Sequence, residues 1–199
     1  MPISPFAEKS TNEHLNETHQ MHLNKPIVST LIIAMVPILG MTAHAYDRTQ
    51  LELIQKSVAS WNAMRKAQPD IAIDLSKANL EKSNLKGANL SFANLSKAEL
   101  SGAMLDNALL TGANLSMAYL KKTNLKGADL TNAWLKDANM NGAFMEQSNL
   151  SGSNLTSTNL RWSKLSKANL SQANLSGTNL FEADLEEANL KGTQLNGAA

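Results

Sequence analysis

Histidine and cysteine are the side chains that most often serve as bases, nucleophiles or metal ligands, and this chain has four histidines and no cysteine. A catalytic serine needs a base that a third group orients, and a thiolate metal site needs cysteine. All the histidines (His14, His19, His22 and His44) lie within the first 45 residues. Past residue 45 only lysines and carboxylates could act as a base, with neither a metal-spaced cluster nor a glycine-rich phosphate loop. We therefore predict a protein that is not an enzyme and that holds no cofactor and no metal.

The other candidates for a site are aromatic and arginine side chains, which commonly anchor protein interfaces. Four of them lie within a stretch composed mainly of Leu, Ala, Asn and Ser: Tyr119, Arg161, Trp162 and Phe181. A binding patch requires these side chains on one surface, so the elements that carry them decide whether they can act together.

Leucine recurs every fifth residue over most of the chain. Between Leu75 and Leu195 there are 25 positions spaced five apart; leucine fills 23, and Met140 and Met145 fill the other two. Two residues earlier stands Ala, Ser or Thr, with Ile73 as the exception. A helix would scatter such leucines around all its sides, and a straight strand would send them alternately to opposite faces. The spacing suits a chain that bends once per repeat, so that every leucine and the small residue before it point toward one axis.

The outward positions of the repeat favour regular turns. Asn occupies 14 of the 25 places just before the leucine, where a short polar side chain can bond neighbouring backbone. Glycine recurs two places after the leucine, where we expect a turn with positive φ. It does so at Gly87, Gly102, Gly112, Gly127, Gly142, Gly152, Gly177 and Gly192.

Segments such as Ala78-Asn79-Leu80 resemble the pentapeptide-repeat family, whose consensus is written A(D/N)LXX. The resemblance covers residues 71–197. It implies an all-β fold over residues 71–199, a right-handed quadrilateral parallel β-helix in which four repeats form a coil of twenty residues. The 25 repeats then make about six coils, stacked at the inter-strand spacing of about 4.8 Å.

In such a coil, positions twenty apart stack into columns. One outer face then carries Tyr119, Lys121, Lys122, Arg161, Trp162 and Phe181. From these we predict a candidate partner patch of Tyr119, Arg161, Trp162 and Phe181. Another column, Lys86, Asp106, Lys126 and Glu146, alternates in sign and predicts a ladder of surface ion pairs.

The first 45 residues have the features of an export signal with a leader. Lys25 precedes an apolar run over 27–41, and Ala43-His44-Ala45 forms a small-x-small cleavage site before Tyr46. Translation starts at Met1 or Met21. A membrane span needs about 20 apolar residues, so we expect cleavage after Ala45 and no stable span, with an uncleaved anchor as the alternative. Cleavage would place the protein in the periplasm or outside the cell.

Residues 46–70 are predicted to cap the β-helix with one amphipathic helix over 47–67. Its apolar residues follow helical spacing: Leu51, Ile54, Val58 and Trp61. Asp47 is the expected N-cap and Pro69 the stop. The run from Trp61 to Ile71 resembles a leader found ahead of many domains of this family. Trp61 is the candidate capping residue, placed to plug the first coil.

These observations predict an exported, non-catalytic binding or scaffold protein for an unidentified protein partner. The alternative is a DNA mimic that interacts with gyrase or another topoisomerase, a role known in the family. Removal of residues 1–45 takes away two lysines and three glutamates and leaves a formal charge of +2, which argues against a DNA mimic. The near-neutral balance also argues against nucleic-acid binding. Because the final coil has no predicted cover, we expect weak homodimerisation through it.

Overall fold

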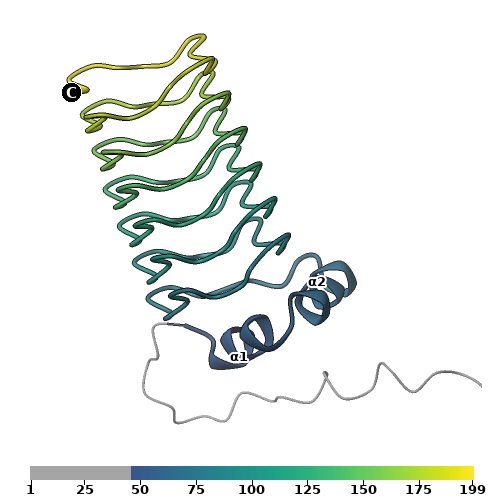
Figure 1. Ribbon diagram of the computed structural model, residues 1–199. Helices are drawn as coiled ribbons and strands as arrows, with labels where there is room; N and C mark the ends of the chain where they lie inside the picture. The colour runs from purple at the N-terminus through teal and green to yellow at the C-terminus, as the bar shows by residue number, and fades with distance from the viewer. Residues whose placement is uncertain (1–45) are drawn as a thin grey trace, which may run out of the picture. The chain divides into compact units, whose positions relative to one another are not determined.

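The computed structural model describes residues 46–199, and the predicted signal segment with its cleavage site lies outside the described residues. Within the described range, two short helices precede a stack of coils, and the chain ends on the last coil, at the far end from the helices (Figure 1).

The helices are α1 (Arg48–Lys56) and α2 (Val58–Ala67). The prediction of one continuous helix over 47–67 is therefore wrong. Ser57 adopts an extended backbone, with φ −161° and ψ 114°. Its N–H donates to the Leu53 carbonyl and ends α1, while its side chain accepts from Ser60 N and begins α2. A serine placed to cap the next helix thus breaks a stretch whose apolar spacing is helical throughout.

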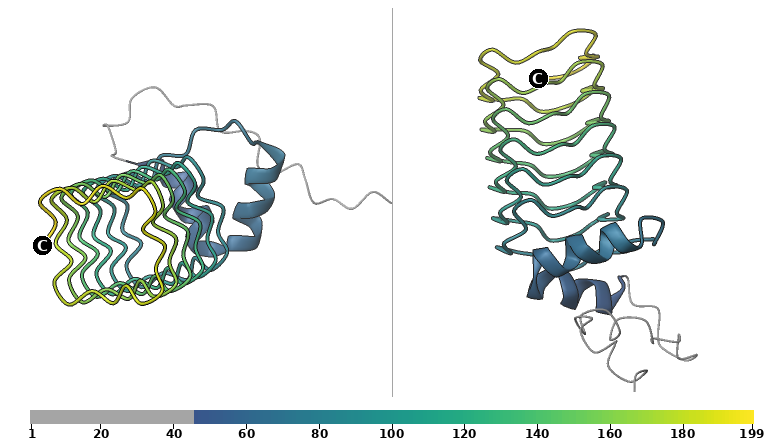
Figure 2. Two further views of the ribbon diagram at one scale, coloured as in Figure 1. Left: turned by 90° about the horizontal axis from the view of Figure 1, so that it is seen from above. Right: turned by 90° about the vertical axis from the view of Figure 1, so that its right-hand side faces the viewer.

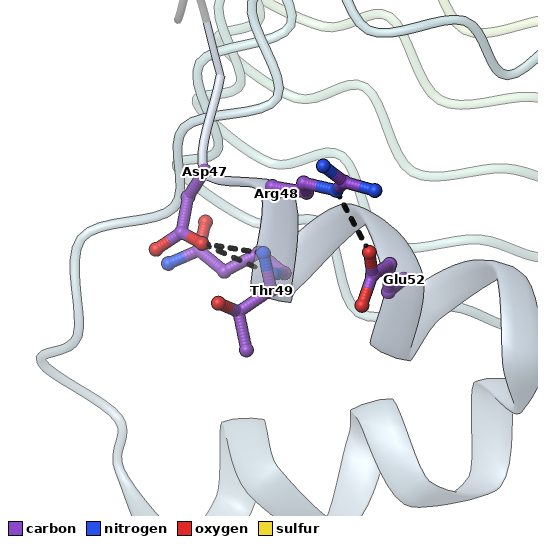
Figure 3. A network of polar contacts seen from close by, with 5 residues as sticks. Asp47, Arg48, Thr49 and Glu52 are labelled. Carbon is purple, nitrogen blue, oxygen red and sulfur yellow. Dashed lines mark hydrogen bonds and ion pairs between the residues drawn. The ribbon is translucent and has the colours of Figure 1, made fainter. Parts of the chain in front are cut away.

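The start of α1 agrees with the predicted N-cap. The Asp47 carboxylate accepts from the N–H of Thr49 at 2.9 Å and of Gln50 at 3.2 Å (Figure 3). Arg48 and Glu52, one turn apart, form an exposed ion pair at 2.9 Å. Asp47 also donates its own N–H to the Asp74 carbonyl at 2.8 Å, so the entry to α1 is joined to the first coil.

The coils pair in parallel with a register of twenty residues. Asp74 pairs with Asn94, Asn94 with Asn114, and the same step continues in each column of the stack. Each repeat contributes a single pairing residue, so the described range has no longer strand. Viewed from above, successive coils have the same outline, and each is displaced slightly in the same direction from the one before (Figure 2). The chain is thus a β-helix with four repeats in each coil, as the resemblance described above implies.

The core runs along the axis of the stack. The leucines from Leu75 to Leu175 and the alanines two residues before them are buried, together with Met140 and Met145. Where a buried Ser or Thr replaces the alanine, its hydroxyl donates to a backbone carbonyl. Thr123 donates to the Leu100 carbonyl in the coil below at 2.7 Å, and Ser148 donates to Met145 within its own turn at 2.7 Å. The buried hydroxyls of the coil interior are therefore hydrogen-bonded, as buried polar groups usually are.

Each corner is a four-residue turn. The amide of the inward small residue donates to the carbonyl of the preceding leucine, as Ala78 does to Leu75 at 3.1 Å. The third residue of every turn has positive φ, which confirms the prediction for the eight recurring glycines. Sixteen non-glycine residues adopt the same conformation, among them Lys77, Phe92 and Trp162. The repetitive ladder on both sides of each turn thus imposes a backbone that L-residues disfavour.

Two glycine-to-alanine variants should separate this backbone cost from crowding. A Cβ added at Gly87 meets nothing within 4 Å, so Gly87→Ala should lower the free energy of unfolding by about 1 kcal/mol from the positive φ alone. At Gly112 the added Cβ would lie 2.6 Å from the ring of Phe92, so Gly112→Ala should cost about 1 kcal/mol more. Urea denaturation measures both. The extra cost should vanish in a Phe92→Ala background, and its persistence there would contradict the crowding.

Candidate functional site

The predicted capping residue lies under the first coil. Trp61 is fully buried, and its indole Nε1 donates to the Asn89 carbonyl at 2.8 Å. The next residue, Asn62, forms a reciprocal pair: its Nδ2 donates to the Gly87 carbonyl at 2.9 Å, and its Oδ1 accepts from Asn89 N at 2.8 Å. Leu51, Ile54 and Met64 pack into the same core. The helices therefore cover apolar atoms and backbone polar groups together.

The remaining side chains on this edge were missed by the sequence analysis. Gln50 donates to the Ala72 carbonyl and accepts from Asp74 N, at 2.8 and 2.9 Å. Gln55 donates to the Asn79 carbonyl at 2.9 Å. Arg65 donates to the carbonyls of Ile71 and Ser91, and burial lowers the pKa of its guanidinium. No local pattern distinguishes these side chains from ordinary polar residues of a surface helix.

Three of the four predicted patch residues form one cluster. The Arg161 guanidinium carbon lies 4.6 Å from the centre of the Trp162 ring and 4.5 Å from that of Phe181. The Trp162 indole N–H donates to the Glu182 carboxylate in the next coil at 2.8 Å. Trp162 and Phe181 are each about half exposed (48%). These contacts restrict the rotamers of the exposed side chains and hold a cation against two aromatic rings.

Tyr119 shares that face but is not in contact with the cluster. It pairs through its backbone with Asn139, and Asn139 pairs with Asn159, so Tyr119 lies two coils from Arg161. Lys121 and Lys122 occupy the turn just after Tyr119, and both are exposed. The intervening coil presents Asn139, Asn141 and Gly142 at the corresponding positions. The predicted patch is therefore two groups separated by one coil of small polar residues.

The residue before each leucine usually has a structural role that Tyr119 does not fulfil. The Asn or Asp at this place accepts the backbone N–H two residues later, as Asn94 does from Ser96 N at 3.2 Å. This confirms the expected bond to neighbouring backbone. Among the described residues, this side-chain bond is absent where the sequence departs from Asn or Asp, at Glu99, Met104, Leu109, Tyr119, Trp134, Phe144, Lys164 and Gln194. An aromatic residue at this place, such as Tyr119, does not supply the turn hydrogen bond that Asn or Asp would make.

Exposed apolar residues also occur on the other faces. Phe92 is 75% exposed, and its ring lies against Gly112 in the next coil, which gives it a packing role. In the sequence, the signal for this packing was a phenylalanine at a turn position where the repeat favours positive φ. Trp134 is 57% exposed and lies on another face, close to Lys136. Met117 lies beside Lys136 in the stack, since Met117 N donates to the Lys136 carbonyl. No aromatic or cation–π contact holds Trp134 among the described residues.

Polar side chains in two of the outer columns, those that contain Asp106 and Asp129, form contacts within the fold. Lys86 lies 3.8 Å from Asp106, but no other rung of the predicted ion-pair ladder forms in residues 46–199. The prediction of a continuous ladder is therefore wrong. At its second rung the Asp106 carboxylate accepts from Asn124 Nδ2 at 2.6 Å, while no ion pair with Lys126 forms. Burial raises the pKa of the Asp129 carboxyl, but hydrogen bonds from Thr131 and Thr111 outweigh it and lower the pKa below its usual value. Each of these carboxylates thus makes hydrogen bonds within the fold.

Residues 46–199 contain no group of three or more metal-ligating side chains. In the same range, no helix has the length and apolar character needed to cross a membrane.

The model of the family "Pentapeptide repeats" matches this chain in eight copies, over residues 73–112, 105–142, 128–166 and 163–198. No curated protein matches. Among solved structures the chain is similar to HetL, a pentapeptide repeat protein involved in heterocyst differentiation regulation from the cyanobacterium Nostoc sp. strain PCC 7120. The two are 29% identical over 60% of this chain and 75% of HetL, with a TM-score of 0.32.

Two further solved structures show the same kind of likeness. A pentapeptide repeat protein of the Arabidopsis thaliana thylakoid lumen is 29% identical over 44% of this chain and 58% of its own, with a TM-score of 0.35. The plasmid-mediated fluoroquinolone resistance protein QnrB1 is 20% identical over 62% of this chain and 75% of its own, with a TM-score of 0.46.

Proposed function

This chain belongs to the pentapeptide-repeat family, and from that premise we propose that it is a non-catalytic binding protein that presents the aromatic–basic face of its β-helix to a protein partner. We define this face by Tyr119, Lys121, Lys122, Arg161, Trp162 and Phe181. The observation that carries the proposal is the Arg161 guanidinium held against two half-exposed aromatic rings. Arginine and aromatic side chains fixed in place lose little conformational entropy on binding, which is why they dominate interface energetics.

The rigidity of the scaffold supports the same role. Each coil is joined to the next by backbone hydrogen bonds on all four sides, so the positions of surface side chains are set by the ladder. Solenoids of this kind offer extended surfaces for partners. Tyr119 and Trp162 replace residues that would serve the turns better, since Asn restores the acceptor at position 119 and tolerates the positive φ at position 162.

The test is affinity capture from extracts of the source cells with the full chain and a Tyr119→Asn/Trp162→Asn variant. We expect a partner that the wild type retains and that the variant binds at least tenfold more weakly, because both anchors are removed at little cost to folding. Trp134→Asn is the matched control, since it also exchanges an exposed aromatic residue for Asn but on another face. A partner retained equally by the wild type and the double variant would refute the patch.

A gyrase-interacting DNA mimic is the alternative. It rests on the family resemblance, and it requires a run of negative charge along the rod. The aromatic–basic face instead carries three cations, Lys121, Lys122 and Arg161. The formal charge of the chain without residues 1–45 is +2. A supercoiling assay distinguishes the two roles: inhibition of gyrase by this chain would favour the alternative.

We further propose that the chain is exported and cleaved after Ala45, so that the working protein begins at Tyr46 in the periplasm or outside the cell. The charged residue, apolar run and small-x-small site of the first 45 residues support this. The contacts of α1 begin at Asp47, so cleavage would leave the helix cap intact. Intact mass after cell fractionation tests it: a full-length cytosolic form would overturn the assignment.

The proposal also assigns a role to each end of the β-helix. We assign to α1 and α2 the role of a cap that pairs the edge of the first coil, through the contacts of Gln50, Gln55, Trp61, Asn62 and Arg65. At the other end Leu190 and Leu195 are 39% and 44% exposed, which supports weak self-association through the last coil. Sedimentation at increasing concentration tests this association, and a monomer throughout would exclude it.

A further inference from the structure

We infer that the aromatic–basic face binds a short acidic peptide segment in extended conformation, with two carboxylates that reach Arg161 and the Lys121–Lys122 pair across one coil. This inference rests on the proposed function, because it specifies the chemistry of the partner that the same face binds.

The first argument is that the cations of this face lack carboxylate partners. Ion pairs in residues 46–199 join Arg48 to Glu52, Lys82 to Glu81, Lys86 to Asp106 and Lys167 to Glu187. Arg161, Lys121 and Lys122 take part in none of them. The Arg161 guanidinium is placed by two ring contacts alone, so its N–H donors have no acceptor among the described residues. A stacked guanidinium with free donors is a prepared site for a carboxylate, which it binds through two parallel hydrogen bonds.

The second argument is the register of the two cationic groups. Lys122 N donates to the Asn141 carbonyl at 3.0 Å, and Gly142 N donates to the Arg161 carbonyl at 2.8 Å. One coil therefore separates the two turns, and their backbones lie two coil spacings, or about 9.6 Å, apart. Gly142 and Asn141 between them present little or no side chain. A peptide lying along the rod axis can cross this coil without meeting a bulky residue.

The separation between the two cationic turns matches the repeat distance of one extended peptide conformation. A polyproline II chain rises about 3.1 Å per residue and returns to the same face every third residue. Two acidic residues three positions apart would then point to the same side, about 9.3 Å from each other. The half-exposed rings of Tyr119 and Trp162 stand at the two ends of this span, and aromatic side chains are the usual surfaces for such chains.

Negative charges lie at both ends of the aromatic–basic face, and they favour a short peptide over a nucleic acid as its ligand. Glu99 lies one coil below Tyr119 in the same column, and Glu182 lies one coil above Trp162, where it accepts the indole N–H. A nucleic acid that followed the rod would bring phosphates against both carboxylates, whereas a peptide with two carboxylates ends before them. The positively charged part of this face spans three coils, a length that accommodates only a few peptide residues.

The test measures fluorescence anisotropy at low ionic strength with the full chain and a labelled peptide, Pro-Glu-Pro-Pro-Glu-Pro. We expect saturable binding that weakens with added salt, and at least tenfold weaker binding of the matched glutamine peptide, because charge-assisted hydrogen bonds are lost. Arg161→Gln should weaken binding of the glutamate peptide by about tenfold. Lys136→Gln, a charge removal on another face, should leave it unchanged. A peptide with the same composition and adjacent glutamates should bind more weakly, since it reaches only one cationic group.

Equal binding of the glutamate and glutamine peptides would overturn the inference. So would tighter, Arg161-dependent binding of a single-stranded oligonucleotide, which would make nucleic acid the occupant. Equal binding of the two glutamate peptides would remove the two-site geometry. If neither peptide binds while partner capture still depends on Tyr119 and Trp162, the proposed function survives with a different partner chemistry. If capture is also unaffected, both proposals fail.

Discussion

Replacing Trp61 with alanine should lower the free energy of unfolding by about 3–5 kcal/mol, a large fraction of the stability of a domain this size. The side chain is fully buried beneath the first coil, and its indole N–H is the donor for the Asn89 carbonyl. Its loss leaves a cavity at the end of the core and an acceptor without its partner. Since each coil is stabilised by its neighbours, an open first coil also weakens the coils that follow.

Two matched variants separate the contributions. Trp61→Phe keeps most of the ring but removes the N–H, so it should cost about 1–3 kcal/mol, which is the penalty for an unpaired buried acceptor. Trp162→Ala removes a half-exposed tryptophan from the outer face and should cost about 1 kcal/mol or less. Chemical denaturation followed by circular dichroism measures all three. Equal losses for Trp61→Ala and Trp162→Ala would contradict the cap.

The cap variant should also change the state of association. The first coil presents unpaired backbone groups once the side chains of α1 and α2 no longer cover it, and such an edge can pair with another chain. Sedimentation of Trp61→Ala should therefore show oligomers that the wild type lacks at the same concentration.

A central leucine should matter far more than a terminal one. Leu135 is fully buried between coils on both sides, so Leu135→Ala should cost about 2–5 kcal/mol. The cavity cannot close easily, because the backbone around it is fixed by the ladder: Leu135 N bonds the Asn154 carbonyl at 2.7 Å, and Ala138 N bonds the Leu135 carbonyl at 3.0 Å. Leu195, which is 44% exposed in the last coil, should cost about 1 kcal/mol when replaced by alanine.

Urea denaturation of the two leucine variants tests this difference. Hydrogen exchange adds a second measurement, since Leu135→Ala should raise exchange in the coils next to residue 135, whereas Leu195→Ala should affect only the C-terminal coil. Similar destabilisation by both substitutions would mean that the stack does not unfold as a series of neighbouring coils.

The inward and outward positions of each repeat could be predicted from the sequence. Because the repeat is a local property of the chain, the five-residue spacing and the size of the side chains were enough to place leucine and alanine inside, Asn in the turn and glycine at positive φ. The register of twenty, and with it the face shared by Tyr119, Arg161, Trp162 and Phe181, followed from the resemblance to the pentapeptide-repeat family.

Features that depend on neighbours outside the repeat could be known only from the folded chain. The break at Ser57 could not be predicted, since the apolar spacing of the two helices is continuous and the first coil determines how each helix docks. The pairing of Gln50, Asn62 and Arg65 with the edge joins residues 22 to 27 positions apart. The stacking of Arg161 on Trp162 and Phe181, while Lys121 stays unpaired, depends on rotamers set across coils. A period fixes where a residue lies, but the contacts its side chain makes are set by what the stacked coils bring beside it.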